Sequence, residues 1–144
     1  MKPYKKTQGV YYLKSDFRKA DQELLDFLFL SAAQEDLNIS RCCLHLDESS
    51  LLMTMLIAIR NKFVYPAHRH NWKDESYTII KGQCNYEEYD KKSNLIHKTF
   101  LEEGDTLLNV NRTFHLLRPL TNQLAFIEST IGPFRKDGLE FLNE

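Results

Sequence analysis

Two histidines separated by a single residue are the first feature of this chain that could do chemistry. Residues 65–75 read YPAHRHNWKDE, so His68 and His70 are followed by Glu75 five positions later. Imidazole and carboxylate groups are ligands for borderline divalent ions such as Zn, Fe, Mn, Ni and Co. An isolated pair of this type also occurs on basic surfaces, so the surrounding elements must decide between a metal site and a surface patch.

The two histidines share a face if residues 63–70 form a strand, because side chains alternate along a strand. Arg69 then points to the other face, where we expect a surface or subunit contact. A second predicted strand, 75–82, begins with Glu75 and places Tyr77 on the same face. If these faces turn inward, the carboxylate approaches the imidazoles.

A third histidine, His115, lies on a predicted strand over residues 113–120. Alone, it is equally well explained as a half-buried histidine with a backbone hydrogen bond. Together with the other residues it would complete a set of three imidazoles and one carboxylate. Four protein ligands leave open positions on a six-coordinate ion, which is typical of a reactive site rather than a closed structural one.

The elements that must position these residues are short runs rich in β-branched and aromatic side chains, separated by turn signals. Such a pattern predicts an antiparallel sandwich or a small barrel, and a barrel has the advantage of leaving no exposed edges. The predicted strands are 41–47, 52–59, 63–70, 75–82, 83–90, 95–101, 105–110, 113–120 and 123–130. Gly82 is expected to permit a tight hairpin between two of them.

A different pattern precedes the strands. Residues 16–36 carry an apolar stripe at helical spacing that includes Phe17 and Leu24, with Asp16 as a candidate N-cap. Residues 10–13, VYYL, are expected to pair as a strand.

Composition restricts the classes of function. The 144 residues carry a formal net charge of -1, with 42% hydrophobic and 27% charged residues, which is an ordinary globular balance. This charge gives no electrostatic reason to bind nucleic acid or an anionic membrane. The most apolar run, 51–59, is too short to span a bilayer, and no apolar segment follows the basic start. Three cysteines, two of them adjacent, favour a reduced, cytoplasmic protein.

We expect a single structural domain in two parts. Residues 1–40 form an arm and helix packed on the barrel, and residues 41–144 form the barrel.

The joint spacing of the candidate ligands is more specific than any one of them. Residues 68–82 follow the pattern H-x-H-x4-E-x6-G, and residues 104–115 follow G-x10-H. This pair resembles the two motifs of the cupin superfamily, in the right order. The resemblance implies a small antiparallel jelly-roll barrel, here preceded by an α-helix. It also implies the metal ligands His68, His70, Glu75 and His115.

Three positions of the second motif depart from the common cupin pattern. Val110 and Arg112 stand where a proline and a glycine are frequent, and Pro119 stands where an asparagine is frequent. These positions shape turns rather than bind metal, so the expected ligand set is unchanged.

A closer resemblance, to the WbuC-type cupin metalloproteins, covers most of the chain. It is carried by SRCCLHLD (40–47), FVYPAHRHNWKDESYTIIKGQ (63–83) and FIESTIGPF (126–134). Ala67 is an insertion relative to the usual proline–histidine step. Met53 and Thr54 stand where a Gln-Arg pair is common. That family is associated with O-antigen and surface polysaccharide gene clusters, which implies a sugar or sugar-nucleotide ligand.

Other residues near the proposed site have both a functional and a packing interpretation. Tyr77 and His45 are candidate catalytic residues, although a barrel-filling tyrosine and a packed strand histidine are at least as common. Arginines could bind an anionic group of the substrate, and Arg41 is one of them. The substrate-binding residues that we predict are Arg60, Arg118 and Glu128.

Several functions agree with this site. The first is a metal-dependent enzyme with isomerase or epimerase chemistry on a small polar molecule, in which one divalent ion acts as a Lewis acid. An iron-dependent dioxygenase, a non-enzymatic ligand or metal sensor, and a metal-free ketoisomerase that uses histidine and tyrosine are the alternatives. We expect a homodimer.

Overall fold

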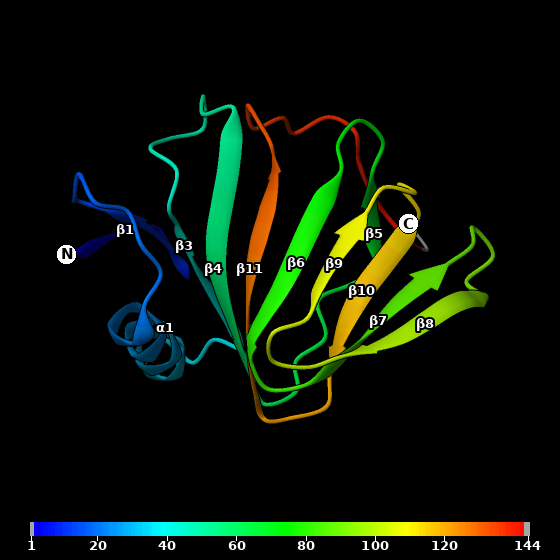
Figure 1. The fold of residues 1–144 in the computed structure, drawn as a ribbon, viewed down its shortest axis with the longest axis horizontal. Coiled ribbons are helices and arrows are strands. Elements are labelled where there is room, and N and C mark those ends of the chain that lie inside the picture. The colour runs from blue at the N-terminus through cyan, green and yellow to red at the C-terminus, as the bar shows by residue number, and fades with distance from the viewer. Residues whose placement is uncertain (1, 143–144) are drawn as a thin grey trace.

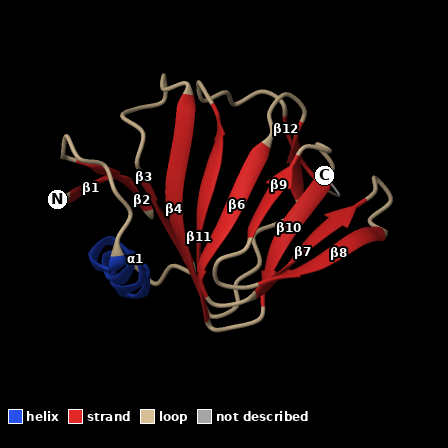
Figure 2. Cartoon of the chain, in the orientation of Figure 1, coloured by secondary structure: helices blue, strands red, loops and turns tan. Residues whose placement is uncertain are grey.

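The structure, a computed structural model, describes residues 2–142 and contains two β-sheets (Figures 1 and 2). The larger sheet has the strand order β1 (Pro3–Thr7), β2 (Val10–Leu13), β3 (Ile39–Cys43), β4 (Leu52–Arg60), β11 (Gln123–Ile131), β6 (Glu75–Lys81) and β9 (Thr106–Asn109). The smaller sheet has the order β12 (Leu139–Phe141), β5 (His68–His70), β10 (Phe114–Pro119), β7 (Cys84–Tyr89) and β8 (Leu95–Leu101). The predicted all-β fold is confirmed.

Neighbouring strands are antiparallel, except for the parallel pair β2 and β3. Residues 1, 143 and 144, at the outer ends of the two predicted parts of the chain, lie outside the described range. Within residues 2–142, no helix has the length and apolar content that crossing a bilayer requires.

Strand β4 is buried on both faces, which explains why its sequence is almost continuously apolar. Leu56 and Ala58 point to the outer face of the larger sheet, and both are 0% exposed. Ile57 and Ile59 point to the inner face, between the two sheets. The strand therefore joins two hydrophobic clusters, one beneath the helix and one inside the barrel.

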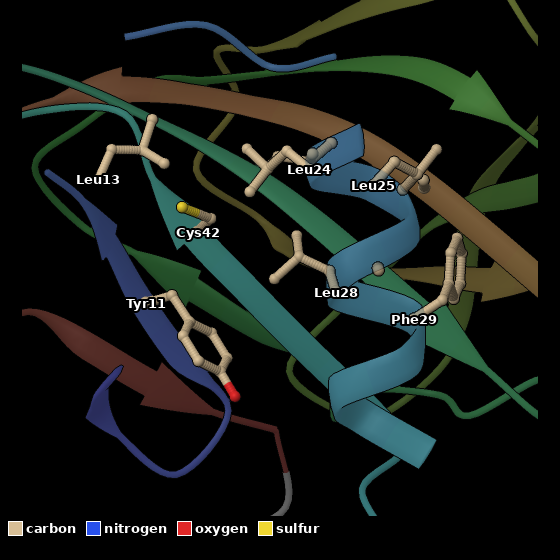
Figure 3. Packing of buried hydrophobic residues seen from close by; sticks show 10 residues of the cluster. Tyr11, Leu13, Leu24, Leu25, Leu28, Phe29 and Cys42 are labelled. Carbon is tan, nitrogen blue, oxygen red and sulfur yellow. The ribbon is translucent and has the colours of Figure 1, made fainter. Parts of the chain in front are cut away.

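The helix α1 (Gln22–Gln34) covers the outer face of the larger sheet (Figure 3). Its buried side chains Leu24, Leu25, Leu28 and Phe29 pack against Tyr11 and Cys42. The helix therefore supports the barrel wall from outside and contributes no residue to the inner face.

The predicted start of this helix is wrong. It begins at Gln22 instead of residue 16, and its N-cap is Asp21, whose carboxylate accepts the amide of Leu24 at 3.0 Å. Phe17 is 84% exposed. The side chain of Arg18 holds the preceding segment in a non-helical path, because it donates to the backbone carbonyls of Leu13, Ser15, Leu44 and His45.

Replacing Asp21 with alanine removes the acceptor for the Leu24 amide, so we expect the free energy of unfolding to fall by about 1 kcal/mol. Asp16 is exposed and caps no helix, and Asp16→Ala should leave stability unchanged. Urea unfolding of both variants measures the difference. Equal effects of the two substitutions would contradict this assignment of the cap.

One predicted strand and one predicted hairpin also differ from the structure. The predicted strand 63–70 is reduced to β5, because Pro66 lacks an N–H for the ladder and Asn61 and Lys62 turn the chain with φ values of 59° and 53°. The predicted hairpin at Gly82 does not form. β6 and β7 lie in different sheets, and the turn carries the chain from one sheet to the other. Strands β1 and β12 were not predicted.

The two sheets face each other and enclose the second hydrophobic cluster (Figure 1). Its largest members are Tyr77, Tyr86 and Phe126, joined by Ile79, Leu117 and Leu124. Beyond these side chains the packing gives way to a cavity between the sheets, and the predicted ligands lie beside it.

Candidate metal centre

Two of the three histidines are direct partners across neighbouring strands. His68 in β5 pairs with His115 in β10, and their ring centroids lie 4.7 Å apart. The ring of His70 lies 5.4 Å from that of His68. Strand alternation therefore turns His68 and His70 to one face, and the pairing adds His115.

The carboxylate comes from the opposite sheet. Oε1 of Glu75, the first residue of β6, lies 3.5 Å from Nε2 of His115 and 3.8 Å from Nε2 of His70. The donor atoms of His68, His70 and Glu75 lie within 4.8 Å of one another. Two ligands that are each bonded to one first-row ion lie about 3–4 Å apart. The separations of 3.5 and 3.8 Å from the Glu75 carboxylate fall in this range.

Backbone carbonyls fix the proton positions on two of the imidazoles. Nδ1 of His68 lies 3.0 Å from the carbonyl oxygen of Pro66, and Nδ1 of His115 lies 2.9 Å from that of Thr113. A carbonyl only accepts, so in both rings Nδ1 carries the hydrogen. Nε2 of the neutral ring then has the lone pair that a metal ligand needs, and this arrangement is usual for metal-binding histidines.

Two of the histidines are held in the neutral, ligating form. Burial lowers the pKa of His68 to about 4, and the charge of His115 acts in the same direction. Burial also lowers the pKa of His70 to about 4, against the opposing effect of the Glu75 carboxylate. At neutral pH neither ring is an imidazolium, so neither has to lose its extra proton before it binds a metal ion.

Glu75 and His115 form a buried charged pair. Burial acts to raise the pKa of Glu75, but the hydrogen bond with His115 and the charge of His70 lower it to about 2. Burial acts to lower the pKa of His115, yet the hydrogen bonds with Glu75 and Thr113 raise it above its ordinary value. The carboxylate is therefore ionised, and without a metal ion the Nε2 of His115 holds the proton next to it, so an ion that binds this nitrogen must displace that proton.

Two further side chains support His115. The Tyr77 hydroxyl lies 2.9 Å from its Nε2, and burial raises the pKa of Tyr77 well above its ordinary value. The Asn109 side-chain amide lies 3.1 Å from its Nδ1, and because Nδ1 already donates to Thr113, the amide packs against the ring without donating to it. Asn109 was not singled out by any motif. Its place in the predicted strand 105–110 was the only signal that it would lie near this site.

A cavity of about 450 Å³ opens beside these residues. Tyr77, His45 and Glu128, all named from the sequence, line it. Glu128 in β11 is the direct partner of Tyr77 in β6. Burial and the neighbouring Glu75 raise the pKa of Glu128 to about 7.

The structure does not place Arg60 and Arg118 at the cavity, and their contact with substrate stays a prediction. Arg60 donates to the carbonyls of Ala32 and Leu37, at 3.3 and 3.1 Å, and so ties the end of the helix to β4. Arg118 forms an ion pair with Glu87, with 3.0 Å between Nε and Oε2. Among the arginines of residues 2–142, it is Arg41 that lines the cavity.

The departures from the family pattern have local explanations. Arg112 adopts φ 54°, the left-handed backbone that the more usual glycine adopts easily, so the turn is retained despite the substitution. The carbonyl of Ala67 accepts the amide of Leu142 at 2.9 Å, which ties the inserted residue to the segment that pairs with β5. Neither change displaces a ligand from the cluster.

A model of the protein family described as "Domain of unknown function (DUF6016)" matches residues 20–101. A search of the curated proteins finds no match.

Several solved structures share the fold. A protein with a double-stranded beta-helix domain from Klebsiella pneumoniae matches with a TM-score of 0.58 and 14% identity, covering 74% of this chain and 86% of that one. KdgF from a Halomonas species matches with a TM-score of 0.56 and 21% identity, covering 69% and 83%. The capsular polysaccharide assembling protein CapF from Staphylococcus aureus matches with a TM-score of 0.56 and 12% identity, covering 68% and 31%.

This chain thus spans about a third of the length of CapF. The likenesses establish the fold, which is a double-stranded β-helix.

Proposed function

Because the chain belongs to the DUF6016 family, whose description assigns no activity, we propose its function from the site: a metal-binding cupin that acts on a sugar or nucleotide-sugar intermediate of surface polysaccharide synthesis. The observation that carries the proposal is the cluster of His68, His70 and Glu75, with donor atoms within 4.8 Å of one another at the wall of a cavity. His115 is the fourth ligand that we propose. The ion is one of Zn, Fe, Mn, Ni or Co.

The sugar assignment has separate support. The WbuC-type resemblance of the sequence suggests a polysaccharide pathway, and one structural neighbour is described as a capsular polysaccharide assembling protein. Both are arguments from likeness, and the cavity adds an argument from size, because about 450 Å³ lies in the range of sites for small polar ligands. A cytoplasmic homodimer stays a prediction.

The chemistry that we propose is isomerisation or epimerisation. A divalent ion at this site would supply Lewis acidity toward an oxygen of the ligand. The chain itself supplies hydrogen-bonding groups beside the cluster. The Tyr77 hydroxyl keeps its proton and can donate it in a hydrogen bond, and the Glu128 carboxyl faces the same cavity one strand away. Tyr77 would orient a hydroxyl of the sugar, and Glu128, whose pKa is about 7, would exchange a proton with the carbon skeleton.

Metal-dependent proton exchange tests this function. Protein purified without a histidine tag is analysed for metals, stripped with a chelator, and reloaded separately with each of the five ions. Nucleotide sugars are then incubated with each form in D2O, and deuterium incorporation is followed by NMR. We expect exchange that is lost on stripping and restored by at least one ion.

The other outcomes separate the alternatives. Exchange that survives stripping indicates metal-free isomerisation. Oxygen uptake by the ferrous form, without exchange, indicates a dioxygenase. Tight ligand binding without turnover under any condition indicates a binding protein.

A further inference from the structure

The cavity wall extends well beyond the metal ligands. On the inner face of the larger sheet, direct strand partners form a row that runs Tyr12, Cys43, Met55, Glu128 and Tyr77. All five line the cavity. The Tyr77 end touches the metal ligands, and the opposite end lies on β2 and β3. Neighbouring strands are about 4.8 Å apart, so β3 and β6, which are three strand spacings apart, are separated by about 14 Å across the sheet.

At the β3 end, a histidine has an unused donor. His45 is 8% exposed, and its Nε2 is buried without a hydrogen-bond partner. Nδ1 of His45 lies 3.1 Å from the amide nitrogen of Thr54 and 3.2 Å from its carbonyl oxygen. The amide can only donate, whereas the carbonyl already accepts the amide of Leu44, so we assign Nδ1 as the acceptor of the Thr54 amide. Since Nδ1 accepts, the neutral ring carries its hydrogen on Nε2. A buried N–H without an acceptor is costly, and a ligand that accepts from it removes the cost.

A cation without an ion-pair partner lines the same cavity as this donor. Arg41 lines the cavity, and within residues 2–142 no carboxylate forms an ion pair with its guanidinium. Arg41 stands two residues before Cys43 on β3, and His45 lies two residues beyond Cys43, just after the strand ends. The Arg41 charge acts on the Cys43 thiol, and the ring of Tyr12 packs edge-on against His45 at 5.7 Å.

Other charged groups line the same cavity. The cations are Lys6 and Lys73, and the carboxylates besides Glu75 are Glu48 and Glu128. Glu128 interacts electrostatically with Arg41 and with Glu75, which lies on the neighbouring strand β6, but within residues 2–142 it forms no ion pair with an arginine or lysine. Glu48 is exposed at the rim. The guanidinium therefore keeps its donors for a ligand.

We propose that Arg41 and the Nε2–H of His45 form a subsite for an oxyanion, the carboxylate or phosphate group of a ligand whose other end reaches the metal cluster. The inference rests on the proposed function, because it names the ligand class of the same cavity. A guanidinium and an N–H donor suit an oxyanion, and a hydroxyl would leave the charge unmatched. A ligand that spans both ends must be longer than a two-carbon acid.

Matched pairs of sugars test the subsite. Glucuronate and glucose 6-phosphate are each compared with glucose by calorimetry on the metal-loaded protein, and by NMR of the His45 Nε2–H signal. We expect each acid to bind at least about tenfold more tightly than glucose, because a charged hydrogen bond contributes on this scale. Preference for one acid over the other identifies the carboxylate or the phosphate as the natural group.

Three variants sharpen the test. Arg41→Met should abolish the preference for the acids, and Arg41→Lys should retain part of it. Lys91→Met removes a cation from the exposed turn between β7 and β8 and should retain all of it. Equal binding of acid and neutral sugar by the natural chain, no measurable binding of either acid, or an unchanged preference in Arg41→Met would overturn the subsite.

Metal content, measured on the same samples, separates this result from the metal proposal. Normal metal content without a preference for the acids contradicts the proposed subsite and leaves the metal proposal intact. Acid preference that depends on Arg41 in a chain that binds no metal sinks the metal centre alone.

Discussion

Replacing His70 with alanine should reduce bound metal from one ion per chain to a small fraction of that. His70 offers its Nε2 to the cluster 3.8 Å from the Glu75 carboxylate, and its side chain is 16% exposed. Changes to groups that only orient a ligand already weaken metal binding by about 10- to 100-fold, so loss of a ligand should cost at least the upper figure. Elemental analysis and competition with a chromogenic chelator measure the loss.

The chain contains its own control for this substitution. His97 lies on β8 with an exposed side chain and belongs to neither motif. His97→Ala should bind metal like the natural protein. The same contrast should appear in thermal unfolding, because a metal that binds only the folded state raises the melting temperature. Unchanged metal occupancy in His70→Ala would sink the ligand assignment.

The second large effect is expected at Gly82, where the chain passes from one sheet to the other. Its φ is 81°, and a Cβ there would overlap the carbonyl oxygen of Gln123 and crowd the hydroxyl of Thr121. Backbone strain and the clash with a carbonyl together should make Gly82→Ala about 2–4 kcal/mol less stable. The melting temperature should fall by about 6–12 °C.

Gly104 separates the two causes. Its φ is 94°, but nothing lies within 4 Å of the position that a Cβ would take. Gly104→Ala should therefore show the conformational cost alone, about 1 kcal/mol. Chemical unfolding of both variants gives the comparison. If the two alanines destabilise the protein equally, the contact with Gln123 is not what requires glycine at residue 82.

The proximity of His68, His70 and Glu75 could be anticipated from the sequence because their relationships are local, whereas His115 was added by the resemblance to the second cupin motif. His68 and His70 are two apart on one strand, and Glu75 begins the next predicted strand, so alternation alone sets their faces. The predicted strands coincide closely with the observed ones from 75 to 131. Here the alternation of side chains and the turn residues agree with each other.

The differences arise where long-range contacts override local pattern. Asp16 and Phe17 fit a helical stripe, but Arg18 binds the carbonyls of Leu44 and His45, which are distant in the sequence, and fixes a loop there. Arg60 and Arg118 looked available for an anion. Their partners, the last turn of the helix and Glu87, become neighbours only in the folded chain. The spacing of residues in the sequence does not indicate which partners these arginines have in the folded chain.

The unused donor of His45 could not have been predicted for the same reason. Its tautomer depends on the amide of Thr54, nine residues away across the β3–β4 connection. From the sequence, His45 was only one of two candidate catalytic residues, and Arg41 was one of several arginines. The fold brings both to one wall of the cavity.

The row of direct strand partners from Tyr12 to Tyr77 spaces residues along the cavity wall at about 4.8 Å, one residue per strand. The proposed anion subsite and the metal ligands occupy its two ends. The residues between the two ends, Met55 on β4 and Glu128 on β11, set the length of ligand that can reach both ends. Substitution of Met55 alone could therefore change which ligand length the cavity accepts, while the residues at both ends stay the same.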